Sequence, residues 1–236
     1  PAASLIWSGL AAGVLISFSV LGEAIFRGYL PDEPWRYLIE NVGYSFGFLL
    51  VILGRMQLFT ENTITTVLPL MAERTSACLT ATLRLWGIVL LANVAGALVA
   101  AAFMAFTGVF DGVLETALMD LSRHATGFPP LEAMLRGIPA GILVAAIVWM
   151  MPSQNGGEIL LIILFTWLIA AGDFTHIIAG SVEMWLLMLK GELAAFDALF
   201  QFFIPVLIGN VVGGTAVFTV LAWGQVKAEV EKQTSP

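Results

Sequence analysis

The stretch Gly-Asp-Phe-Thr-His at residues 172–176 interrupts an apolar run that otherwise extends from Glu158 to Leu189. Polar backbone and ionisable side chains are costly in the middle of a helix surrounded by lipid, because no water is present there to bind them. Such groups are tolerated where the helix is broken and the break lines a cavity. The stretch therefore predicts a membrane protein with a discontinuous helix beside a solute pathway.

Composition indicates that lipid contacts most of the surface. Hydrophobic residues make up 59% of the 236 positions and charged residues only 11%, whereas a soluble domain carries roughly 25% charged residues. The mean hydropathy is +0.93. At about 20 apolar residues per span, this length accommodates six helices with short connections. We therefore expect an all-α polytopic membrane protein with six transmembrane helices.

The second span resembles the fifth. The polar stretch 55–62 separates two apolar pieces, and neither piece reaches the roughly 20 residues that a span needs. We therefore expect both the second and the fifth helix to be broken. The expected membrane domain covers residues 1–226, and 227–236 form a polar C-terminal tail.

Short motifs recur in the two halves of the chain. Phe-Thr occurs at residues 59–60 and 174–175, and Asn-x-x-Gly follows each pair. The asparagine lies 33 residues after the threonine in the first half and 35 in the second. A repeat of three spans must reverse its orientation, which gives an inverted pair about an axis in the membrane plane. We expect inverted repeats at about 5–108 and 131–224 that meet at the broken helices.

The Asn-x-x-Gly motifs are expected to serve helix packing. Glycine lets two helices approach closely in lipid, and an asparagine side chain can form hydrogen bonds across the contact. The residues concerned are Asn93, Gly96, Asn210 and Gly213.

Over nearly its whole length, the chain resembles the formate/nitrite transporter family. Leu-Phe-Thr-Glu-Asn at 58–62 is similar to the family pattern L-F-T-G-N, with Glu61 in place of the glycine. Residues 174–179 are similar to G-F-E-H-S-x-A-N, and 205–214 contain P-x-x-x-G-N-x-x-G-G. Within the family, the chain looks most like the YfdC-type branch.

The resemblance implies an aquaporin-like fold and a homopentamer with one pore in each protomer. It also implies a channel or transporter for small monovalent anions such as formate and nitrite. The expected location is the bacterial cytoplasmic (inner) membrane, with both termini in the cytoplasm.

The resemblance and the breaks together point to His176 and Thr60 as the polar centre of the pathway. Imidazole can act as a neutral donor or a transient proton carrier, so we expect proton-linked transport. A threonine hydroxyl both donates and accepts hydrogen bonds. Apolar constrictions exclude hydrated ions. The further residues expected in the pathway are Asn62 and Asp173 at its polar surface, with Leu58, Phe59 and Phe174 at constrictions.

Several residues depart from the family pattern, and we expect atypical selectivity from them. Gly141 and Gly180 stand where the family carries asparagines that hold the imidazole or contact the anion. Asp173, three residues before His176, would place a negative charge near an anion. Arg55 is expected to pair with Glu61 or Asp173 in a neutral network, because buried charges are normally paired. Arg123 and His124 precede the fourth span, either as a basic site that attracts anions or as a solvated loop.

Two other classes of function remain open. One is a channel for neutral small solutes, which acidic groups at the centre of the pore would favour. The other is a membrane scaffold or sensor whose charged breaks close the pore. A nucleic-acid partner is not expected, because the net charge is −7 and nucleic-acid binding needs a basic surface. An enzyme, a cofactor and a bound metal are not expected either, because the sequence contains no metal-ligand cluster, phosphate-binding loop or nucleophile–base pattern. The single cysteine excludes a thiolate cluster.

Overall fold

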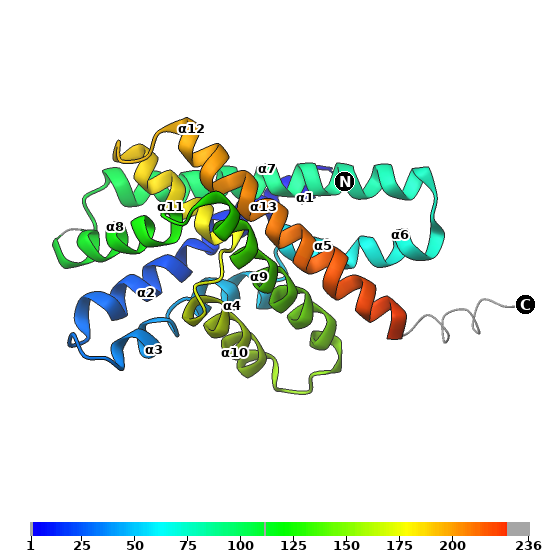
Figure 1. Ribbon diagram of the computed structural model, residues 1–236, viewed down its shortest axis with the longest axis horizontal. Coiled ribbons are helices and arrows are strands. Elements are labelled where there is room, and N and C mark those ends of the chain that lie inside the picture. The colour runs from blue at the N-terminus through cyan, green and yellow to red at the C-terminus, as the bar shows by residue number, and fades with distance from the viewer. Residues whose placement is uncertain (1, 111, 226–236) are drawn as a thin grey trace, which may run out of the picture.

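The computed structural model describes residues 2–110 and 112–225 (Figure 1). Helices make up most of this part of the chain, which contains no strand. The expected tail at 227–236 lies outside the described residues. In chain order the helices are α1 (Ala2–Leu15), α2 (Ser17–Tyr29), α3 (Arg36–Glu40), α4 (Ser45–Leu53), α5 (Phe59–Thr65), α6 (Val67–Glu73), α7 (Ser76–Phe106), α8 (Gly112–Thr126), α9 (Pro130–Met150), the 3-10 turn η1 (Met151–Ser153), α10 (Glu158–Ala171), α11 (Ile177–Leu189), α12 (Ala195–Asp197), the π-helical η2 (Ala198–Phe203), α13 (Ile204–Val211) and the π-helical η3 (Val212–Thr219).

The all-α polytopic membrane fold is confirmed. Five helical stretches are long and apolar enough to cross a membrane, and the outer surface carries large apolar side chains such as Trp7 (73% exposed) and Leu91 (72%). α10 and α11 are apolar but shorter. The count of six spans therefore stays a prediction. The five long stretches are Ala2–Tyr29, Arg36–Leu53, Ser76–Phe106, Pro130–Ser153 and Ala195–Gln225.

Two helix pairs form the frame of the molecule. α1 packs along α7, and α9 packs along α13 and η3 (Figure 1). The contact is equally close in both pairs, because a Cβ atom at Gly13 would overlap the carbonyl oxygen of Asn93, and one at Gly141 would overlap that of Asn210. Small residues permit this backbone-to-backbone approach in lipid. The two remaining predicted packing glycines behave alike, since a Cβ at Gly96 or Gly213 would meet a carbonyl of the facing helix.

α4 and α10 end in the same backbone motif, and each end opens into a non-helical segment. Arg55 and Asp173 both adopt the left-handed conformation, with φ of 53° and 52°. The next residue then donates its N–H to a carbonyl five positions back, as in a Schellman cap. The two bonds join Met56 to Val51 at 3.0 Å and Phe174 to Ile169 at 2.9 Å.

The hydrogen bonds of two asparagines relate positions in the first half of the chain to positions in the second. Asn93 Oδ1 accepts from the N–H of Phe59, and Asn210 Oδ1 accepts from the N–H of Ile177, both at 2.8 Å. Phe59 therefore corresponds to Ile177, and the preceding Leu58 corresponds to His176. The expectation that the two Phe-Thr pairs are equivalent is wrong, because the two halves share the capped backbone group and not the dipeptide.

Candidate functional site

Asn93 and Asn210 hold the two non-helical segments in place. Both side chains are completely buried. The amide of Asn210 donates to the carbonyls of Gly137 and Thr175, each at 2.9 Å. Asn93 donates in the same way, at 2.8 Å, to Gly9 and to Gln57. Each side chain thus binds three backbone groups. Two of them belong to the non-helical segment and have no helical partner, and the third is a carbonyl of the neighbouring helix. Their role extends beyond the packing expected of them, because they fix where α5 and α11 begin.

The starts of α5 and α11 bring Thr60 and His176 together. Thr60 is fully buried and His176 is 2% exposed, and Thr60 Oγ1 lies 2.8 Å from Nε2 of His176. The N–H of Ala179 donates to Nδ1 of the same ring at 3.3 Å. A backbone N–H only donates, so Nδ1 is the unprotonated nitrogen and Nε2 carries the hydrogen. The neutral imidazole therefore donates to Oγ1 of Thr60.

Apolar side chains surround this polar pair. The ring of Phe48 meets the imidazole edge to face, with centroids 5.0 Å apart. Leu58 is fully buried, and Phe59 is 2% exposed and packs against Trp86 at a centroid distance of 5.7 Å. Water is scarce in such surroundings, so each hydrogen bond to a solute contributes more than it does in water. That Leu58, Phe59 and Phe174 act as constrictions stays a prediction.

A cavity of about 60 Å³ opens beside His176. Roughly 10–15 Å³ holds one water molecule, so this space accommodates a solute of a few heavy atoms. The apolar part of its wall includes Phe174 and Phe202. The ionisable side chains that line it are Glu23, Tyr44, His124, Asp173, His176 and Glu183.

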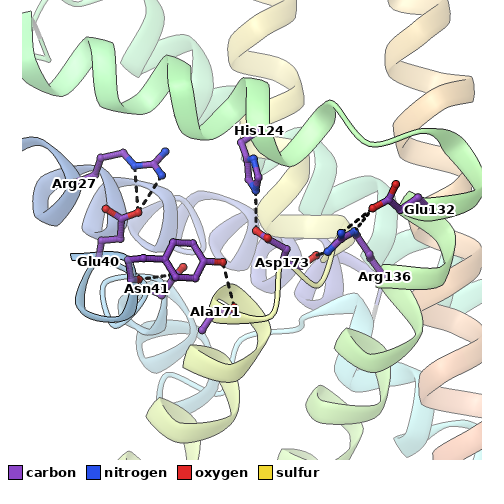
Figure 2. A network of polar contacts seen from close by, with 9 residues as sticks. Arg27, Glu40, Asn41, His124, Glu132, Arg136, Ala171 and Asp173 are labelled. Atoms are coloured by element: carbon purple, nitrogen blue, oxygen red, sulfur yellow. Dashed lines mark hydrogen bonds and ion pairs between the residues drawn. The ribbon is translucent and has the colours of Figure 1, made fainter. Parts of the chain in front are cut away.

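Asp173 lies at the mouth of this cavity and is bound to α8. Its Oδ1 is 2.7 Å from Nε2 of His124, and its carbonyl oxygen accepts from Nη1 of Arg136 at 3.4 Å. Arg136 also pairs with Glu132 at 2.7 Å, and Figure 2 shows the side chains converging on the loop that carries Asp173. The two residues of the Arg123–His124 segment differ in position. His124 lines the cavity, whereas Arg123 lies on the surface and pairs with Asp120 and Glu192.

The contact with Asp173 raises the pKa of His124, chiefly through the hydrogen bond from the imidazole. A histidine whose folded pKa is raised stabilises the protein fully below its unfolded value of about 6.5, and this contribution is lost as pH rises through the folded pKa. We expect the NMR midpoint of His124 to lie above 6.5 and to fall in Asp173→Asn. Asparagine tolerates the left-handed backbone at 173, so the fold is kept.

The chain has only two histidines, so His124→Gln identifies the titrating resonance. An unchanged midpoint in Asp173→Asn would contradict the assignment of this pair.

The break between α4 and α5 and the start of α5 carry three further residues of interest, Arg55, Glu61 and Asn62. Arg55 and Glu61 line a different, open pocket, and in residues 2–110 and 112–225 no ion pair joins Arg55 to Glu61 or Asp173. The neutral network expected of Arg55 is therefore not formed, because Arg55 is exposed and Asp173 is bound by His124. Asn62 donates to Oε1 of Gln57 at 3.3 Å and not to His176.

The two glycine departures have different physical meanings. Gly141 contacts the backbone of Asn210 and does not line the cavity, so the interpretation of Gly141 as a lost pore amide is wrong. Gly180 does line the cavity, and a Cβ atom there would overlap the ring of Phe202. The aromatic ring thus fills the space in which a side chain at 180 would lie.

Sequence reasoning missed Glu23 and Glu183 as members of the site. Glu183 lies on α11 and follows the N-cap residue His176 by seven residues, or about two helical turns, so the two residues lie on the same side of the helix axis. An ionisable residue inside an apolar run is by itself a signal of function in a membrane protein. That signal was present for both glutamates, but their convergence depends on the packing of α2 against α11.

Comparisons with known proteins agree on one family. The profile of the family described as Formate/nitrite transporter matches residues 1–224. The chain is 40% identical to inner membrane protein YfdC of Escherichia coli (strain K12), covering 98% of this chain and 75% of that protein. It is 26% identical to formate channel FocA of Haemophilus influenzae, covering 88% and 81%. A solved structure described as a pentameric formate channel with formate bound superposes with a TM-score of 0.85 at 22% identity, covering 96% and 98% of the two chains.

Proposed function

The chain belongs to the formate/nitrite transporter family, and on that premise we propose that it is a membrane channel for small monovalent anions of weak acids, such as formate and nitrite. The observation that carries the proposal is the buried contact between Thr60 and His176 at the centre of two helix breaks.

The Thr60–His176 pair gives a solute one hydrogen-bond donor next to the apolar side chains of Phe48 and Phe59. A bare anion cannot cross apolar walls cheaply, because its desolvation costs far more than one hydrogen bond returns. The neutral acid loses much less hydration. We propose that the solute takes up a proton before it passes Phe59 and Phe174, so anion transport is proton-linked.

We also propose a homopentamer in the bacterial inner membrane, with one pathway per protomer and both termini in the cytoplasm. Support for the assembly comes from the description of the superposed formate channel as pentameric. Support for the location comes from the E. coli relative, which is described as an inner membrane protein.

Replacing Thr60 by valine tests the central pair. Valine has nearly the same shape and lacks the hydroxyl, so His176 loses its acceptor and the solute loses its donor. A hydrogen bond contributes about 0.5–1.5 kcal/mol, so we expect up to about a tenfold fall in formate and nitrite uptake by proteoliposomes. The matched control is Thr65→Val on the same helix, where the side chain is exposed.

Two outcomes would contradict the proposal. Equal anion uptake by wild type and Thr60→Val would remove the pair from the pathway. Uptake of glycerol without formate or nitrite would favour a neutral-solute channel, the alternative that the carboxyl groups of the cavity support.

A further inference from the structure

The cavity beside His176 contains two carboxyl groups that the family-type mechanism above does not use. Glu23 comes from α2 and Glu183 from α11. Glu183 is 7% exposed and has no hydrogen-bond or ion-pair partner among the described residues. A buried polar side chain without a partner is rare in folded proteins and calls for an explanation. The small exposed fraction of Glu183 faces the cavity, where a solute would lie.

The positive charges near the cavity are already bound elsewhere. Arg27 donates to Glu40 at 3.0 and 3.2 Å, and His124 binds Asp173. Figure 2 shows Arg27 turned toward Glu40 of α3, and His124 turned toward Asp173. The two glutamates are therefore not neutralised by a cation of the fold.

We propose that Glu183, with Glu23 beside it, is the group that exchanges a proton with the solute in this cavity. The proposal rests on the proposed function and deepens it by assigning the proton donor. A carboxyl group with no protein partner has its proton site open to whatever occupies the cavity. In the step, the O–H bond of the Glu183 carboxylic acid breaks as an O–H bond forms on the anion. The products are the neutral solute acid and the Glu183 carboxylate, which regains a proton from the aqueous side.

The surrounding ionisable groups fit this assignment. Tyr44 precedes α4, His124 lies on α8, and Asp173 and His176 lie in the break between α10 and α11. His176 already uses both ring nitrogens, on Thr60 and on the N–H of Ala179, and Asp173 is bound to His124. Among the described residues that line the cavity, η2 contributes Phe202 and no ionisable side chain. The two glutamates are the carboxyl groups left for the exchange.

The test is formate uptake by proteoliposomes at several pH values, for wild type and Glu183→Gln. Glutamine keeps the shape and polarity but carries no exchangeable carboxyl proton. General acid–base groups contribute roughly 10²–10⁴-fold, so we expect uptake at neutral pH to fall at least about tenfold. The deficit is expected to shrink at acidic pH, where more formate arrives already protonated. Glu183→Asp is expected to restore part of the neutral-pH rate, and protein-free liposomes give the background.

A purely structural defect would lower uptake equally at all pH values and would overturn the proposal. So would wild-type behaviour of Glu183→Gln. The matched control is Glu73→Gln, an exposed carboxyl at the end of α6. If Glu183→Gln does not purify as a stable protein, Glu23→Gln is measured in the same way, with the same expected pH-dependent loss. Absence of formate uptake by wild type contradicts both the proposed function and the proton exchange by Glu183. Formate uptake that neither Glu183→Gln nor Glu23→Gln changes contradicts the proton exchange alone.

Discussion

Asn210→Leu is expected to prevent the protein from reaching its folded state in quantity. The substitution removes one acceptor and two donors, so the N–H of Ile177 and the carbonyls of Gly137 and Thr175 lose their side-chain partner. The carbonyl of Gly137 lies inside α9 and keeps its helical hydrogen bond, so two groups are left unsatisfied. At about 1–3 kcal/mol for each buried unsatisfied group, the loss is about 2–6 kcal/mol. Folded proteins are stable by only about 5–15 kcal/mol. The loss is therefore a large part of the free energy of unfolding.

The measurement is thermal unfolding in detergent, followed by fluorescence of the tryptophans. A protein of this size loses about 2–4 °C in Tm per kcal/mol, so a fall in Tm of at least about 4 °C is expected if any folded Asn210→Leu protein is recovered. Asn210→Asp keeps the acceptor and loses the donors, so it should fall between wild type and the leucine variant. The control is Asn155→Leu, on an exposed connection. An unchanged Tm for Asn210→Leu would contradict the role assigned to the cap.

Membrane class and approximate helix positions could be predicted because hydropathy is a local property of the chain. Every long apolar run became a helix, and both polar stretches became the segments between α4 and α5 and between α10 and α11. The cost of unpaired polar groups in lipid makes such breaks visible without any knowledge of the fold. His176 and Thr60 were found for the same reason, since each is a polar side chain within a break.

The register of the repeat could not be predicted from the dipeptides. Leu58 and His176 occupy equivalent positions, but their side chains have different chemistry. The two halves share a backbone N–H that is capped by an asparagine 34 residues later in the first half and 33 residues later in the second. Such a correspondence appears only when three-dimensional hydrogen bonds are compared. The two left-handed residues, Arg55 and Asp173, show the same point, because neither is a glycine that would mark the cap in the sequence.

The assignment of Gly141 failed for a related reason. Its place in the chain resembled that of a pore asparagine, yet helix rotation turns it toward α13, where backbone contact leaves no room for a side chain. The convergence of Glu23 and Glu183 also requires tertiary structure, because 160 residues separate them in the chain. In both cases the sequence gives the residue type, but the rotation of the helix about its axis determines which neighbour the residue faces.

Gly141→Ala is the second substitution expected to have a severe effect, although it adds a single methyl group. The new Cβ would overlap the carbonyl oxygen of Asn210 and approach the N–H of Gly214. Backbone atoms cannot rotate away as a side chain can, so α9 and α13 must separate. Overpacking costs typically 1–3 kcal/mol and sometimes more, and here it would also displace the asparagine that caps α11. We therefore expect a fall in Tm of several degrees and loss of formate uptake.

Gly87→Ala is the matched control for this effect. Both glycines lie inside long membrane helices, but a Cβ atom at Gly87 meets nothing within 4 Å. Alanine favours the helix over glycine by about 0.5–1 kcal/mol, so Gly87→Ala should raise Tm slightly and leave transport unchanged. Gly13→Ala, the equivalent change between α1 and α7, should reproduce the damage of Gly141→Ala, because its Cβ would overlap the carbonyl of Asn93 in the same way. If Gly141→Ala instead behaved like Gly87→Ala, the close contact between α9 and α13 would be wrong, and an asparagine at 141 could again reach the pathway.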